Sequence, residues 1–108
     1  MAITETLNKP LNVCRMAVIS HIDTGTVAAR EFLVGFKPRY VRVYNETDGI
    51  TEEWFEGMAD AEGLLRIANG TASLITTNGI TPSAQGFTLG LNTTIYITSK
   101  QYSILVFG

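Results

Sequence analysis

The stretch that decides the fold runs from Gly35 to Gly57, GFKPRYVRVYNETDGITEEWFEG, and its first half predicts a β-strand. Apolar and polar residues alternate strictly in YVRVY, the period-2 pattern of a half-buried strand. Two valines share one face of this strand, and the opposite face carries Tyr40, Arg42 and Tyr44. The side chains on this second face are therefore expected to be accessible to a partner.

A polar turn and a return strand complete the predicted hairpin. Pro38 stands just before the first strand, where a residue without an amide proton is tolerated. NETDG at residues 45–49 supplies the turn. The return strand, residues 50–55, carries Trp54 and Phe55 on opposite faces, so one ring can enter the core while the other meets a neighbouring element or a partner. The stretch contains no catalytic motif.

The rest of the chain is predicted as short strands separated by turns. Asn69-Gly70 and Asn78-Gly79 have the composition of hairpin turns. Residues 27–34 also suit a short helix, but flanking glycines leave room for only about two turns, so a strand is expected. The clearest alternation lies at residues 94–98. The expected strands are residues 11–20, 27–34, 40–44, 50–55, 64–68, 72–77, 86–91, 94–98 and 102–107.

These elements predict an all-β fold, either a sandwich or a jelly-roll-like barrel of about eight short antiparallel strands. One domain is expected over residues 11–108, preceded by an extended N-terminal arm over residues 1–10. The arm is polar and ends in a proline. No apolar run is long enough for a membrane helix, and no secretion signal is recognised, so synthesis in the cytoplasm is expected.

The charges of the chain are segregated along the sequence. The formal net charge is −2, which argues against a nucleic-acid partner because phosphate binding takes a basic face. Lys37, Arg39 and Arg42 precede a block of acids between residues 46 and 62. This block is either a solvated edge that prevents unwanted strand pairing or half of a complementary contact between subunits. The expected contact residues are Lys37, Arg39, Tyr40, Arg42, Tyr44, Glu52, Glu53 and Glu56.

Few residues suggest catalysis or metal binding. His21 and Asp23 lie two apart at a predicted turn, but His21 is the only histidine. The acids at positions 48, 52, 53 and 56 lack the spacing of an EF-hand loop, and Glu52 and Glu53 point to opposite faces of a strand. Cys14, the only cysteine, is expected to be a small core residue that forms no internal disulfide. The sequence therefore predicts no enzyme activity, cofactor or metal.

Two longer stretches resemble small structural proteins of tailed-bacteriophage virions. They are GFKPRYVRVYNETDGITEEWFEGM and TTNGITPSAQGFTLG, and the resemblance covers roughly residues 36–90. It implies a component of the virion, made in the host cytoplasm. A capsid decoration (cement) protein is favoured over a tail or fibre component. Such proteins are commonly small, β-rich and oligomeric, so a homotrimer that binds the major capsid protein or another virion protein is expected.

Two other functional classes compete with this expectation. A sugar-binding or adhesion module would use exposed aromatic rings, for which Trp54, Tyr40, Tyr44 and Tyr96 are the candidates. A small enzyme would depend on His21. Loss of glycan binding on Trp54→Ala would favour the first class, and loss of turnover on His21→Ala would favour the second.

Overall fold

A computed structural model describes residues 15–22, 28–97 and 99–108, and the described residues form strands and connecting turns without a helix. The all-β fold class and the expected number of strands are confirmed. The expected N-terminal arm, Cys14 and Asp23 lie outside the described residues. The strands are β1 (Met16–Ile22), β2 (Arg30–Leu33), β3 (Tyr40–Asn45), β4 (Ile50–Phe55), β5 (Glu62–Arg66), β6 (Ala72–Pro82), β7 (Gly86–Leu89) and β8 (Gln101–Phe107).

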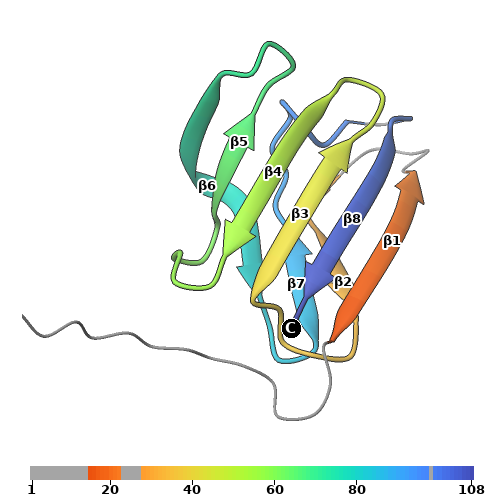
Figure 1. The fold of residues 1–108 in the computed structure, drawn as a ribbon, viewed down its shortest axis with the longest axis vertical. Coiled ribbons are helices and arrows are strands. Elements are labelled where there is room, and N and C mark those ends of the chain that lie inside the picture. Colours follow the sequence, from red (N-terminus) through yellow and green to blue (C-terminus); the bar gives the residue numbers. More distant parts are fainter. Residues whose placement is uncertain (1–14, 23–27, 98) are drawn as a thin grey trace, which may run out of the picture.

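All eight strands belong to one antiparallel sheet that curls into a half-barrel (Figure 1). The strand order is β1-β8-β3-β4-β5-β6-β7-β2. β8, the last strand in sequence, is inserted between β1 and β3. β1 and β2 form the two ends of the sheet, and the His21 and Phe32 rings meet edge to face across these ends at 5.3 Å.

The core lies on the concave side of the sheet. Its buried apolar residues are Phe32, Phe36, Val41, Val43, Trp54, Leu65, Ile80, Phe87, Leu89, Ile95, Tyr96, Tyr102, Ile104 and Val106. The predicted faces of the central hairpin are confirmed, since Val41 and Val43 are fully buried. Trp54 is 4% exposed, whereas Phe55 is 43% exposed. The indole Nε1 of Trp54 donates a hydrogen bond to the Ala59 carbonyl at 3.2 Å.

The predicted hairpin turn at Asn78-Gly79 is wrong, because both residues lie within β6, a continuous strand of eleven residues. Its pairing with β5 shifts register, so that Gly63 pairs with Ile75 but Glu62 pairs with Ile80. Asn78 does have a positive φ, of 57°, as the Asn-Gly composition of a turn would lead one to expect. A Cβ at Gly79 would lie 2.3 Å from the Glu62 carbonyl, so the glycine permits a close approach of two backbones. The feature is an irregularity within a strand.

The predicted strand at residues 94–98 is also wrong over its described part. The Ile95 and Tyr96 amides both bond to the Asn92 carbonyl, at 3.2 and 2.8 Å, which is turn geometry. Ile95 and Tyr96 are both buried although they are adjacent, which alternation does not allow. β5 likewise begins at Glu62, two residues before the strand expected at residues 64–68.

Candidate functional site

The convex face of the sheet carries a row of large side chains across four strands. The register places Met16 of β1 opposite Phe107 of β8, Phe107 opposite Tyr40 of β3, and Tyr40 opposite Phe55 of β4. The Tyr40 ring lies 5.2 Å from that of Phe55 and 6.0 Å from that of Phe107. Met16 is 57% exposed and the Phe55 ring is also open to solvent. Side chains from distant parts of the chain thus form one apolar strip.

A second row beside this strip combines apolar and charged groups. It consists of Val18, Leu105, Arg42 and Glu53, which lie opposite one another on the same four strands. Val18 is 69% exposed, and the Arg42 guanidinium carbon lies 5.8 Å from the centroid of the Tyr44 ring. A shallow groove of about 130 Å³ runs along this row, lined by Val18, Arg42, Tyr44, Ser103, Ile104 and Leu105. The two rows together with Tyr44 are called the contact face below.

Tyr40 joins the two rows through a hydrogen bond from its hydroxyl to the Glu53 carboxylate at 2.5 Å. Partial burial and this hydrogen bond raise the pKa of the Tyr40 hydroxyl to about 12. The phenol is therefore neutral at any physiological pH. Glu53 is held on the face beside Arg42, so positive and negative groups lie next to each other there.

Seven of the eight expected contact residues divide into three groups in the structure. Tyr40, Arg42, Tyr44 and Glu53 lie together on the contact face, as their alternation predicted. Arg39 forms an ion pair with Glu56 at 3.5 Å, next to a backbone hydrogen bond between the same two residues. Part of the segregated charge is thus paired within the hairpin. Lys37 is exposed just before β3.

Glu52 is not a surface contact residue, and this expectation is wrong. Its side chain is 0% exposed, and neither carboxyl oxygen has a hydrogen-bond partner. Its register partners are Val43 on β3 and Leu65 on β5, both buried. Because the carboxyl group lies in the core, desolvation raises the pKa of Glu52 from 4.5 to about 8. Glu52 is therefore largely a neutral carboxylic acid at pH 7.

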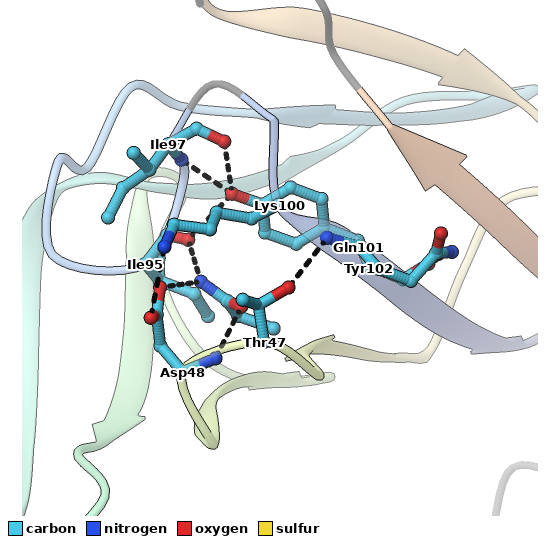
Figure 2. Close-up of polar contacts among 8 residues, drawn as sticks. Thr47, Asp48, Ile95, Ile97, Lys100, Gln101 and Tyr102 are labelled. Atoms are coloured by element: carbon cyan, nitrogen blue, oxygen red, sulfur yellow. Dashed lines mark hydrogen bonds and ion pairs between the residues drawn. The ribbon is translucent and has the colours of Figure 1, made fainter.

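The tip of the central hairpin is fixed to the segment before β8 (Figure 2). The buried Asn45 side chain donates to the Ile95 carbonyl at 2.9 Å and to Asp48 at 3.0 Å, and the Lys100 ammonium pairs with Asp48 at 3.3 Å. The Tyr102 hydroxyl accepts a hydrogen bond from the Ile97 amide. It also lies 2.9 and 2.8 Å from the carbonyl oxygens of Ile95 and Ile97. The acidic tip is therefore a structural network.

The structure gives no support to the metal or acid–base candidates over the part of the chain that it describes. His21 packs its ring against Phe32, and Asp23 is outside the described residues. Asp48 is held by Asn45 and Lys100, and Glu52 and Glu53 lie on opposite faces of β4. Within residues 15–22, 28–97 and 99–108, no three His, Cys, Asp or Glu side chains are grouped to hold a metal ion. The same residues contain no helix that is long and apolar enough to cross a membrane.

Sequence reasoning missed the residues that extend the contact face beyond the hairpin. These are Met16 and Val18 on β1, and Leu105 and Phe107 on β8. Met16 and Val18 fall on one face of the strand expected at residues 11–20, but alternation could not place that strand beside β8. No local signal reports a pairing between segments so far apart in the sequence.

Comparison of the chain with protein-family models, curated proteins and solved structures finds no match. Its function has to be inferred from the residues themselves.

Proposed function

We propose that the protein is a non-enzymatic structural subunit that binds other protein subunits through the contact face. The row of Met16, Phe107, Tyr40 and Phe55 next to Arg42 supports this most directly, because Met16 and Phe55 are exposed and Tyr40 and Phe107 are only half-buried. Contiguous exposed apolar residues with a polar rim are typical of protein interaction sites. Aromatic, Met and Arg side chains are enriched in such interfaces, where a few of them supply most of the binding free energy.

Within this class, we propose a capsid decoration (cement) protein of a tailed bacteriophage. This narrower proposal rests on the resemblance of residues 36–90 to virion structural proteins, which also favours a homotrimer. The contact face then binds the major capsid protein or a second subunit and stabilises the head. A tail or fibre component is the alternative within the virion.

A sugar-binding module receives less support from the positions of the aromatic residues. Such modules stack exposed rings on sugars, but Trp54 and Tyr96 are buried in the core. Only Tyr40 and Tyr44 of the four candidate rings remain on the surface, and Tyr40 packs between Phe55 and Phe107.

The test is to locate the protein on particles produced from its source genome. We expect mass spectrometry to detect it in purified virions and antibody labelling to place it on the head. Labelling on the tail would support the tail alternative, and absence from the particles would overturn the virion proposal. Purified heads that lack the protein should bind the added wild-type chain but not the Arg42→Glu variant.

A further inference from the structure

β1 is a sheet edge without the features that normally prevent edge-to-edge pairing. Its sequence, MAVISHI, contains no Lys, Arg, Asp, Glu or Pro. Charged residues, prolines and short lengths are the usual protection of an edge strand. Among the described residues, β1 pairs with β8 alone, so its other side has no strand neighbour. A regular, uncharged edge of seven residues is therefore open to another strand.

The opposite end of the sheet is protected. β2 has only four residues, REFL, and its Arg30 and Glu31 side chains are both exposed. This contrast within one molecule indicates that the missing protection on β1 is specific to that edge.

The hydrogen bonds of β1 show which backbone groups are directed toward the open side. The amide of Gly108, just after β8, donates to the carbonyl of Arg15, just before β1, at 2.9 Å. These two residues are therefore a hydrogen-bonded pair that continues the ladder between β1 and β8. In an antiparallel ladder, alternate residues direct their N–H and C=O groups to the same neighbour. Ala17, Ile19 and His21 therefore bond toward β8. The groups directed to the open edge belong to Met16, Val18, Ser20 and Ile22.

We propose that the open edge of β1 pairs with β1 of a second copy of this chain, antiparallel about a two-fold axis at Ile19. In this register Met16 lies opposite Ile22 of the other copy, and Val18 lies opposite its Ser20. Each of the four residues whose N–H and C=O groups are directed to the open edge then exchanges hydrogen bonds with an edge-directed residue of the other copy. No charges oppose each other, because β1 carries none apart from a protonated His21, which would lie opposite Ala17.

The pairing also joins the two contact faces. A two-fold axis perpendicular to the sheet keeps the convex faces of both copies on the same side, so the exposed Met16, Val18 and Ile22 side chains of one copy lie beside those of the other. Apolar area left open in one chain is covered by the second, which adds to the backbone hydrogen bonds.

This inference extends the proposed subunit function but depends on the edge of β1 and not on a virion. A two-fold contact cannot occur within a ring of three subunits. If subunits form trimers through the contact face, the β1 edge joins chains of different trimers. If they do not, pairing of the β1 edges alone produces a dimer. In either case the soluble particle contains an even number of chains.

Cysteine cross-linking tests the register directly. In a Cys14→Ser background, Ile19→Cys places one thiol per chain at the axis. Opposite residues of a pair without hydrogen bonds lie about 4.5 Å apart between Cα atoms, within the roughly 4.4–6.8 Å that a disulfide spans. Ala17→Cys is the matched control on the same strand and face, where the two thiols would be separated by about 13 Å along the strand. We expect most of the Ile19→Cys chain, and little of the Ala17→Cys chain, to run as a covalent dimer after mild oxidation.

Sedimentation mass supplies an independent measurement. Val18→Pro removes an N–H that faces the open edge, a position where a strand tolerates proline, and should halve the mass at micromolar concentration. Glu31→Pro is the control on the protected edge of β2 and should leave the mass unchanged. Equal cross-linking of the two cysteine variants would overturn the proposal, as would a wild-type particle with an odd number of chains. These outcomes are independent of whether the protein is found on virions.

Discussion

The Glu52 carboxyl group occupies the space that a side chain at Gly63 would need. A Cβ at Gly63 would lie 3.1 Å from Oε1 and 3.2 Å from Cγ of Glu52. The glycine on β5 thus makes room for an acid on β4 inside the core. This acid faces Val43 and Leu65 and has no hydrogen-bond partner for either oxygen. Arg42 and Arg66 of the flanking strands lie opposite Glu53 and Thr51, on the other face of the sheet.

Glu52 should make the protein less stable as the pH rises. The folded chain retains a proton up to a pKa of about 8, whereas the unfolded chain releases it near 4.5. The free energy of unfolding should therefore be unaffected below pH 4.5 and fall between about pH 4.5 and 8, by up to about 1.4 kcal/mol per pH unit. Glu52→Gln should remove this slope in urea unfolding measured at several pH values. Glu53→Gln on the opposite face should retain it, and equal slopes for wild type and Glu52→Gln would contradict the assignment.

Trp54→Ala should destabilise the fold by about 3–5 kcal/mol, because it removes a buried ring and leaves a cavity. Urea unfolding monitored by far-UV circular dichroism measures the loss. Phe55→Ala is the matched control on the next residue, and its exposed ring should cost no more than about 1 kcal/mol. A comparable loss from both substitutions would show that the two faces of β4 do not differ as described.

Arg42→Glu should weaken subunit association by several kcal/mol while leaving the fold intact. The substitution places two acids, at positions 42 and 53, side by side on the contact face, where like charges oppose binding. An exposed charge contributes little to folding, so the melting temperature should change only slightly. The measurement pairs melting temperature with sedimentation mass. Arg30→Glu on β2 is the control, and an Arg42→Glu variant with wild-type mass would exclude a contact between copies through this residue.

Tyr102→Phe should loosen the segment at residues 95–97 and cost about 1–3 kcal/mol, because the half-buried Ile97 amide loses its hydrogen-bond acceptor. Hydrogen exchange should show faster exchange at Ile97, while amides in the middle of β3 stay protected. Tyr44→Phe on the contact face is the control. Unchanged exchange at Ile97 would mean that the hydroxyl does not hold this segment.

Local patterns predicted the central hairpin because its information is local. Alternation fixed the faces of β3 and β4, and the glycine turns fixed their connection. The same alternation places Glu52 inside, since it lies two residues from Trp54 on one strand. Its charge suggested the surface instead, and strand geometry overruled the cost of burying a carboxyl group.

The position of β8 could not be predicted in this way. The pairing of residues 16–22 with residues 101–107 leaves no mark on either segment alone. The prediction of a strand at residues 94–98 was wrong for a related reason. Their alternation is that of a strand, but the Ile95 carbonyl accepts hydrogen bonds from the side chains of Asn45 and Tyr102, and these contacts outside the segment favour a turn. The contact face depends on the same long-range pairings, so only its hairpin half was recognised.

The insertion of β8 between β1 and β3 has a consequence for how the chain is synthesised. β3, β4 and β5 can pair as they leave the ribosome, because each follows the previous one closely in sequence. β1 is made before them, yet its one strand partner among the described residues, β8, is complete only when residues 101–107 have also emerged. Closing such distant pairs is the slow part of folding a β protein. A nascent chain stopped just before β8 should therefore bind chaperones through its first strand, and release of that strand would mark completion of the sheet.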